Sequence, residues 1–288
     1  MGLENFIPEL WSDRLFVRLR KSLVFGGLVN KDYEGEIRDF GDTVKINELG
    51  PVTASAYTKG ETITYENLSS AQKELVIDQA TKFAFQINDI DQAQSKPKLM
   101  DGAMSEAAYA VANTIDAFIG GLYTHAGVTN TTYMGSSAAA ISVSSGNVLL
   151  TLSYAGRYLS EKNVPEGNRF MVIPPWLHQK ILLAEIGGVA ATAVPKVFDD
   201  GAMTSGYVGD ALGFRLILSN NVQNSATSVS AVMALNRSAI TYAGQSTNVE
   251  AFRLQTGFAN VARGLYLYGA KVVQPDALAC LHLTEVAG

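Results

Sequence analysis

The chain has 288 residues, of which 47% are hydrophobic and 17% charged, enough to bury one large core or two average ones. With 22 Lys and Arg against 27 Asp and Glu, its net charge of −5 does not favour nucleic-acid binding by overall charge. The single cysteine, Cys280, excludes an intrachain disulfide, and three widely separated histidines exclude a local metal motif. Since no targeting segment or 18-residue apolar run is present, we expect a soluble protein made in a reducing cytosol.

Residues 1–42 are predicted to form an arm rather than a domain. An apolar stripe near helical spacing is followed by glycines and charges, and its members are Phe6, Ile7, Leu10, Trp11, Leu15 and Leu19. So few apolar residues would not bury themselves, so the arm needs another surface, in its own chain or a neighbour's. Arg14 and Arg18 belong to a basic cluster with Arg20 and Lys21. This cluster is either a solvated helix face or a contact to an acidic neighbour or, weakly, to nucleic acid.

From Thr43 to Asp89 apolar and polar residues alternate, which predicts β-strands separated by turns such as Gly50-Pro51 and Lys59-Gly60. Residues 50–70 contain few large apolar side chains. The region therefore resembles a long two-stranded projection, which would be marginally stable alone and calls for a docking partner.

A long helix is predicted from Pro97 to about Ala126, because apolar residues recur there every three to four positions. Such a rod would be about 40 Å long. Alternating helices and strands follow and predict a mixed sheet covered by helices. The predicted helices are 148–162 and 174–185, and the predicted strands are 169–173, 214–218 and 229–235. Residues 128–145 are predicted to be a loop, and strands at 265–268, 271–273 and 278–283 are predicted to pair with those at 75–87.

The sequence contains none of the common catalytic or cofactor motifs, so we predict no catalytic, cofactor-binding or metal-binding residues. The serine-hydrolase elbow, the phosphate-binding loop and the dinucleotide fingerprint are all absent, and the acidic stretch at Asp89 lacks the remaining oxygens of a calcium loop. Cys280, His178 and His282 are interpreted as packed or surface residues, and His125 as a favourable cation at a helix end. The chain is accordingly predicted not to be an enzyme.

The order of segments and several short stretches resemble one known family. The stretches are Phe6–Trp11, Asp32–Glu36, Gly41–Ile46, Val76–Gln79, Asp89–Ala93, Val164–Arg169 with Pro174-Pro175, and Gly209–Phe214 with Ser219-Asn220. Together they resemble the major capsid proteins of tailed bacteriophages with the Hong Kong 97 fold, especially the P22-coat-like branch. The resemblance implies an α+β fold with an N-terminal arm, an extended β-hairpin loop, a long spine helix, a peripheral domain and an axial α/β domain.

The same resemblance implies a domain division and a set of partners. Residues 1–42 would form the arm, 43–75 the extended loop, 76–135 with 250–288 the peripheral domain, and 136–249 the axial domain. The subunit would assemble through hexamers and pentamers into an icosahedral shell in the host cytoplasm, enclosing the double-stranded DNA genome without sequence-specific binding and without a membrane. A portal, a separate scaffolding protein and a decoration protein are the further implied partners.

Two other functions stay open at this point. An encapsulin-like nanocompartment shell would share the fold but enclose a cargo protein, and a soluble hydrolase would need a catalytic site built from residues distant in sequence. The residues expected at the assembly interface are Phe6, Leu10, Trp11, Arg14, Arg18, Lys59 and Glu61. Lys59 is also the candidate for a covalent crosslink to an Asn or Asp of a neighbour, although Lys-Gly is ordinary turn chemistry.

Overall fold

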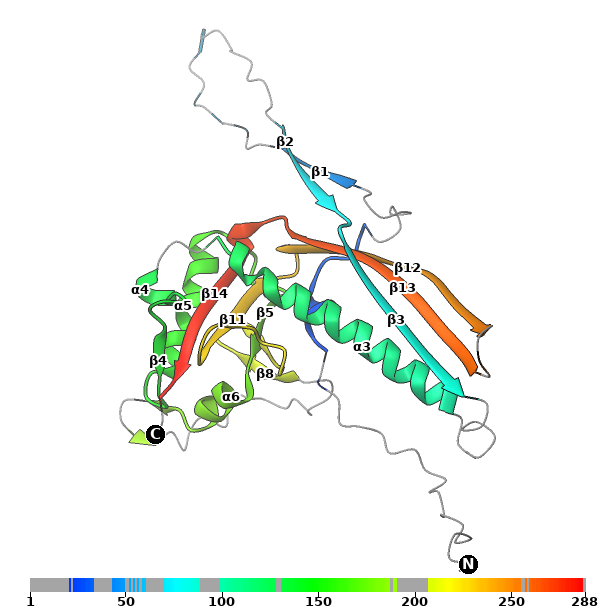
Figure 1. Ribbon diagram of the computed structural model, residues 1–288. Coiled ribbons are helices and arrows are strands. Elements are labelled where there is room, and N and C mark those ends of the chain that lie inside the picture. The colour runs from blue at the N-terminus through cyan, green and yellow to red at the C-terminus, as the bar shows by residue number, and fades with distance from the viewer. Residues whose placement is uncertain are drawn as a thin grey trace, which may run out of the picture.

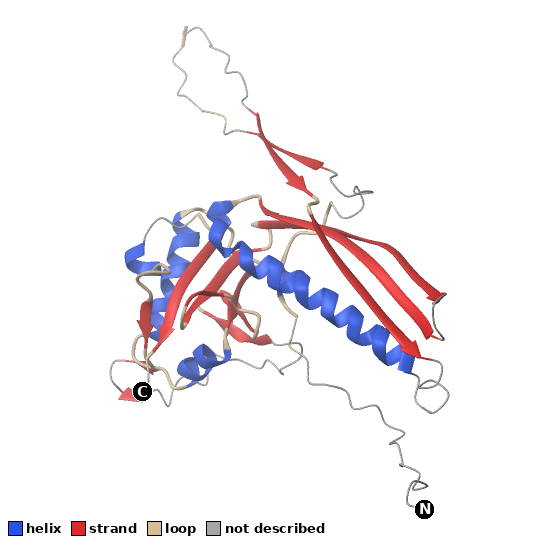
Figure 2. Ribbon diagram, viewed as in Figure 1, coloured by secondary structure: helices blue, strands red, loops and turns tan. Residues whose placement is uncertain are grey.

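The computed structural model contains two β-sheets that share one long helix, with a hairpin that projects from them (Figures 1 and 2). The residues that the structure describes are 21, 23–33, 43–49, 52, 54, 56, 59–60, 70–88, 99–127, 131–186, 189–190, 207–254, 257 and 259–286. All structural statements below concern these residues.

The larger sheet has seven strands and forms the centre of the body. Its strands are β4 (Ile141–Val143), β5 (Arg169–Ile173), β8 (Tyr207–Ala211), β9 (Phe214–Leu218), β10 (Asn224–Ala226), β11 (Val229–Asn236) and β14 (Leu278–Glu285). They lie in the order β4-β14-β11-β5-β9-β8, and β10 pairs with β11. The pairs β4–β14 and β5–β9 are parallel and the others antiparallel, which confirms the predicted mixed sheet.

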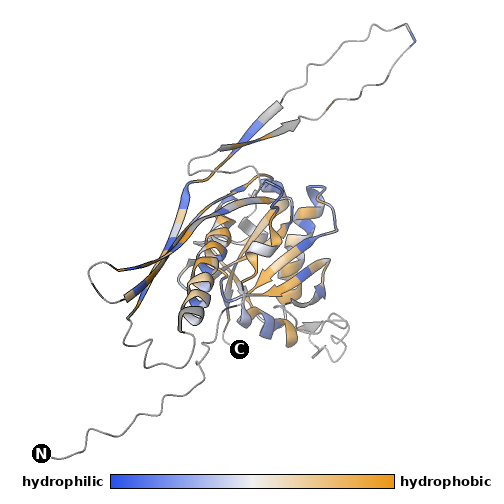
Figure 3. Ribbon diagram, turned by 90° about the vertical axis from the view of Figure 1, so that its right-hand side faces the viewer, coloured by the Kyte–Doolittle hydropathy of each residue, from blue (hydrophilic) through white to orange (hydrophobic). Residues whose placement is uncertain are grey.

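Both faces of this sheet are covered. On β11, Val232 and Ala234 pack with α5 (Val148–Glu161) and α6 (Pro175–Leu182), whereas Met233 and Leu235 pack on the opposite face with the end of α3 (Leu99–Gly121). Every residue of β5 and β11 is therefore buried. Figure 3 shows these central strands as predominantly hydrophobic, as expected for strands that have no solvent-facing side.

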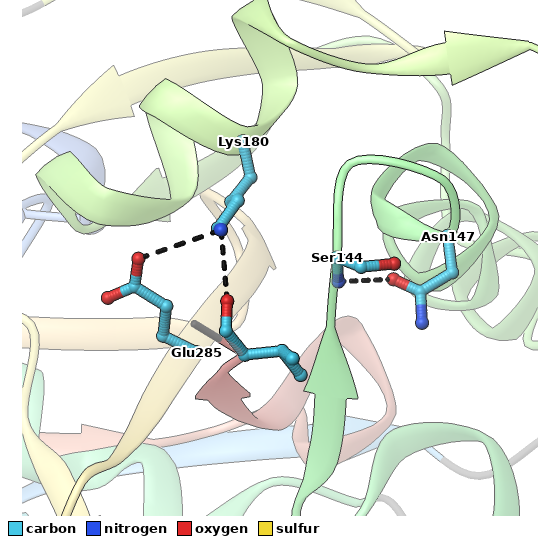
Figure 4. Close-up of polar contacts among 5 residues, drawn as sticks. Ser144, Asn147, Lys180 and Glu285 are labelled. Carbon is cyan, nitrogen blue, oxygen red and sulfur yellow. Dashed lines mark hydrogen bonds and ion pairs between the residues drawn. The ribbon is translucent and has the colours of Figure 1, made fainter. Parts of the chain in front are cut away.

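Polar contacts stabilise the part of the seven-stranded sheet where α6, the end of β14 and the segment after β4 lie (Figure 4). Lys180 of α6 donates a hydrogen bond from Nζ to the Val286 carbonyl at 3.0 Å and lies 3.9 Å from the Glu285 carboxylate. Asn147, directly before α5, accepts a hydrogen bond from the backbone N–H of Ser144 at 2.8 Å. The Lys180 contacts join α6 to the end of β14, and the Asn147 contact closes the turn between β4 and α5.

The smaller sheet has three strands in the order β12-β13-β3, all antiparallel. They are β3 (Gln79–Asn88), β12 (Ile240–Arg253) and β13 (Ala259–Val272). The helix α3 runs along this sheet and continues toward the larger one as η2 (Leu122–His125), as Figure 1 shows. The Phe118 ring packs edge-on against Tyr268 of β13, with ring centroids 5.4 Å apart. The spine helix α3 thus packs against both sheets.

The remaining elements are short, apart from the hairpin formed by β1 (Thr43–Leu49) and β2 (Ser70–Val76). The short ones are α1 (Phe25–Leu28), α4 (Thr131–Met134), β6 (Glu185–Ile186), β7 (Val189–Ala190) and η4 (Pro275–Ala277). No helix in the described ranges is long and apolar enough to cross a membrane.

Most predicted elements are confirmed within a few residues, and three expectations need correction. Residues 278–283 do not pair with the strands at 75–87, because β14 lies between β11 and β4 in the larger sheet. The predicted loop 128–145 contains α4 and β4, the latter because the edge of β14 offers it a parallel partner. The helix predicted through Glu185 ends at Leu182.

Candidate assembly surface

The projecting hairpin is anchored at its base by a small apolar cluster. Val44, Leu75 and Ile77 are buried there together with Ala243 of β12 and Leu267 of β13. The β1–β2 ladder extends from Thr43 opposite Val76 to Leu49 opposite Ser70. These residues confirm the two-stranded base of the predicted projection, which points away from the three-stranded sheet (Figure 1).

Two lysines reinforce the base by crossing between the hairpin and the sheet. Lys73 of β2 donates from Nζ to the Val273 carbonyl at 2.6 Å, and Lys271 of β13 donates to the Glu74 carbonyl at 2.8 Å. Gly269 allows the backbone to approach closely, since a Cβ there would lie 2.3 Å from the Val76 carbonyl oxygen. The base of the hairpin is therefore held by both apolar and polar contacts.

Further along the hairpin the described residues are exposed. Val52 keeps 70% of its surface accessible. Lys59 and Gly60 form an exposed turn, in which Gly60 has a φ of +94° that strongly favours glycine. An exposed strand tip with a well-anchored base is suited to contact another molecule.

The second candidate surface begins where the N-terminal arm joins the body. We call residues 24–30 the arm root. Its apolar members Val24, Phe25, Leu28 and Val29 are buried against the end of α3 and the larger sheet. A backbone bridge pairs Asn30 with Thr241 of β12. Residues 24–30 of the predicted arm thus lie on a surface of their own chain, which is one of the two alternatives left open by the sequence.

The predicted interface residues fall largely outside this description. Phe6, Leu10, Trp11, Arg14, Arg18 and Glu61 lie outside the described residues, as does the acidic stretch at Asp89. Lys59 is the one predicted interface residue that the structure describes, and it is exposed. The sequence analysis assigned no role to Asp116, although this residue is 2% exposed and accepts a hydrogen bond from the arm root.

One pocket brings together a thiol, an imidazole and a hydroxyl group. It has a volume of about 360 Å³ and is lined by Cys280 and His282 of β14, by Ser225 of β10, and by residues of η2 and of the segment that precedes β4. Cys280 Sγ lies 3.8 Å from His282 Nε2, and His282 Nδ1 lies 2.8 Å from Ser225 Oγ. Because strand residues two apart share a face, the spacing of Cys280 and His282 was a signal that the sequence analysis overlooked.

The electrostatics of this pair do not favour a nucleophile. Burial raises the pKa of the Cys280 thiol to about 12 and lowers the pKa of His282. Both shifts favour the neutral thiol and neutral imidazole, whereas an activated cysteine requires a stabilised thiolate. The two side chains are therefore best described as a hydrogen-bonded pair within the β14 layer.

The other predicted chemical residues show no site either. His125 ends η2 at an exposed position, and His178 is half-buried on α6. Across the described ranges, no group of three or more His, Cys, Asp or Glu side chains is placed to hold a metal ion. The features that distinguish this molecule are thus its projecting hairpin and arm root.

Comparison with known proteins agrees with that geometry. A family model described as "Phage capsid protein" matches residues 71–281, well over half of the chain and including both sheets and the spine helix. The chain belongs to the phage capsid protein family. It is a major capsid shell protein, and it has the Hong Kong 97 fold that the sequence predicted. No curated protein sequence matches this capsid protein.

Solved structures resemble the capsid protein over nearly its whole length. A chain of Mycobacterium phage Che8 is 29% identical, with a TM-score of 0.76 over 97% of this chain and 98% of that one. The capsid structure of cyanophage P-SCSP1u is 17% identical, with a TM-score of 0.73 over 100% and 95% of the two chains. The capsid of a native GTA particle is 12% identical, with a TM-score of 0.68 over 98% and 96%. The last two similarities concern the fold alone.

Proposed function

We propose that this capsid protein assembles through hexamers and pentamers into a closed icosahedral shell around the double-stranded DNA genome of a tailed phage. The observation that supports it best is the projecting β1–β2 hairpin, because its base is firmly anchored while Val52 and Lys59 farther along it are exposed. Many weak contacts between identical subunits multiply into a stable shell. The net charge of −5 suits an inner wall that holds DNA without binding it tightly.

The proposal includes the expected partners and location. The shell forms in the host cytoplasm, with a portal at one vertex, a separate scaffolding protein and a decoration protein as partners. The subunit carries out no catalysis, a view supported by the neutral Cys280–His282 pair. Phe6, Leu10, Trp11, Arg14, Arg18, Lys59 and Glu61 are proposed to lie at subunit interfaces.

We also propose the four-part domain division, with a change that strand pairing requires. The arm comprises residues 1–42, the extended loop 43–75, the peripheral domain 76–135 and 250–288, and the axial domain 136–249. Because β14 pairs with β11, residues 278–285 are moved to the axial domain. Because β12 pairs with β13 from Ile240 onward, residues 240–249 are moved to the peripheral domain.

Electron microscopy of the expressed protein tests the main proposal. We expect closed icosahedral particles, either from the protein alone or together with products of neighbouring genes. Particles recovered from infected cells should contain DNA. Soluble monomers under all these conditions would contradict the proposal, and shells that enclose a cargo protein instead of DNA would indicate a nanocompartment.

A truncation tests the role of the arm. Deleting residues 1–20 removes the apolar stripe but keeps the buried residues Val24–Val29. We expect a subunit with unchanged circular dichroism that fails to form shells. Closed shells at normal yield would show that the arm does not join subunits.

A further inference from the structure

A buried carboxylate connects the arm root to the spine helix. Asp116 lies on α3, is 2% exposed, and accepts a hydrogen bond at Oδ1 from the backbone N–H of Gly26 at 3.3 Å. The neighbouring backbone amides of Val24 and Phe25 act in the same direction, since they too lower the pKa of this carboxyl. The Asp116 side chain therefore reaches the start of α1, about 90 positions away in sequence.

The second oxygen of the carboxylate, Oδ2, also accepts a hydrogen bond. Asn221, in the turn after β9, donates from Nδ2 to Asp116 Oδ2 at 2.9 Å and to Asn113 Oδ1 at 3.1 Å. The backbone N–H of Asn221 donates in turn to Ser219 Oγ at 3.1 Å. Asp116 thus joins three segments: the arm root, the spine helix and a turn of the larger sheet.

Packing brings the arm root close to the helix but leaves its orientation to these hydrogen bonds. The Phe25 ring packs against α3 at Gly120, which has no side chain. A Cβ at Gly120 would lie 3.2 Å from this ring. Apolar contact is non-directional. Hydrogen bonds from the Gly26 amide and the Asn221 side chain to one carboxylate are directional and charge-assisted.

This arrangement is not explained by stability alone. Burial raises the pKa of Asp116 above its ordinary value, although the hydrogen bonds from Asn221 and from residues 24–26 act to lower it. The described groups that contact the carboxylate are all uncharged. The backbone N–H of Lys21 donates to the Tyr109 hydroxyl at 2.8 Å, about two helical turns away from Asp116 along α3.

The raised pKa of Asp116 determines how this residue makes the stability of the fold depend on pH. A carboxyl whose pKa is higher in the folded chain stabilises the fold in its protonated form, and this contribution is lost as pH rises through the folded pKa. In its ionised form Asp116 therefore lowers the stability of the fold relative to its protonated form. A buried charge that reduces stability is a candidate for a role in specificity.

We propose that Asp116 is the positioning residue of the N-terminal arm: its carboxylate holds the amide of Gly26, beside those of Val24 and Phe25, and so fixes the orientation of the arm root on the body. The consequence for assembly rests on the proposed function of the arm. The orientation itself is a property of the single subunit and can be measured without assembly.

The principal test is hydrogen exchange on the free subunit carrying Asp116→Asn, which is nearly the same size but uncharged. We expect the amides of residues 24–26 to exchange at least about tenfold faster than in the unmodified chain at pH 7. Global unfolding should occur at the same or higher denaturant concentration, because the desolvation of a charge is no longer needed. The matched control is Asp210→Asn at an exposed position on β8, which should change neither quantity.

Two results would overturn the proposal. One is unchanged exchange at residues 24–26, and the other is faster exchange accompanied by an equal loss of global stability, as expected for a merely structural residue. If the variant does not fold, the unmodified chain provides the same test. As pH falls through the raised pKa of Asp116, and after correction for intrinsic rates, protection of residues 24–26 should fall about tenfold relative to β11, and protection that stays constant relative to β11 over the whole titration would overturn the proposal.

Shell yield separates this inference from the proposed function. If Asp116→Asn loosens residues 24–26 as expected and also lowers the yield of shells, both hold. If it loosens them while shells form normally, Asp116 still positions the arm root, and the proposed role of the arm in assembly fails.

Discussion

The two sheets of this capsid protein differ in how completely their own chain covers them. In the seven-stranded sheet all eight residues of β11 are buried, between α5 and α6 on one face and α3 with the arm root on the other. In the three-stranded sheet β3 alternates between half-buried and exposed residues over 81–87. Phe252 and Leu265 on its other two strands are also substantially exposed.

This difference indicates how one chain divides stability from assembly. The larger sheet is completed by its own helices, so it can supply most of the folding free energy of the free subunit. The smaller sheet and the hairpin that it supports present a face that the described residues of the chain leave exposed. A repeated subunit needs both kinds of region, because it must fold before it can bind its neighbours.

The largest expected effect comes from a cavity in the larger core. Leu152→Ala on α5 removes a side chain that is 1% exposed and should reduce the free energy of unfolding by about 2–5 kcal/mol. Leu150→Ala on the same helix is the matched control, because Leu150 is 59% exposed and should change stability by less than about 0.5 kcal/mol. Denaturant unfolding of free subunits measures both. Equal losses would mean that α5 does not seal this sheet.

Thiol labelling compares the accessibility of the two sheets. Since burial raises the pKa of Cys280 to about 12, a disulfide reagent at pH 8 should label it about a thousandfold more slowly than an ordinary cysteine. A cysteine introduced as Ala84→Cys on the exposed side of β3 should react at the ordinary rate. Unfolding should abolish the difference. Fast labelling of Cys280 in the folded subunit would show that β14 opens readily.

A close backbone approach can be used to disturb the hairpin base. In Gly269→Ala the new Cβ would lie 2.3 Å from the Val76 carbonyl oxygen, so backbone must shift, at an expected cost of about 1–3 kcal/mol. Hydrogen exchange should accelerate in β2 and around Ile77 before it does in β11. Gly121→Ala is the control, since that helical glycine has open space around it and alanine is favoured there by up to about 1 kcal/mol. Unchanged exchange in β2 would contradict the proposed anchoring.

The smallest effect on the free subunit is expected at the hairpin turn. Lys59→Glu reverses an exposed charge and should alter stability by no more than about 0.5 kcal/mol. The yield of shells and its dependence on salt should nevertheless change, because charge complementarity at interfaces is screened by ions. Assembly followed by light scattering at several salt concentrations measures this. A denaturing gel of mature particles also tests crosslinking, because a ladder of covalent multimers would implicate Lys59 and clean monomer would exclude it.

Local patterns in the sequence were sufficient for the elements whose burial repeats regularly. The apolar spacing of residues 99–125 predicted the spine helix, and the strands at 169–173 and 214–218 occur where the apolar runs placed them. The alternation around Val44, Leu75 and Phe83 predicted the hairpin base and β3. In these segments the period of burial is 2 or 3.6 residues, which the sequence records directly.

Contacts between distant segments were decided only by the tertiary structure. Nothing in residues 278–283 distinguishes a partner in β3 from one in β11, because an apolar strand fits any sheet centre. The same holds for Asp116, whose hydrogen-bond partners are the backbone amide of Gly26 and the side chain of Asn221. Backbone amides carry no sequence signature, so a side chain that binds them can be recognised only once the fold has brought the two together.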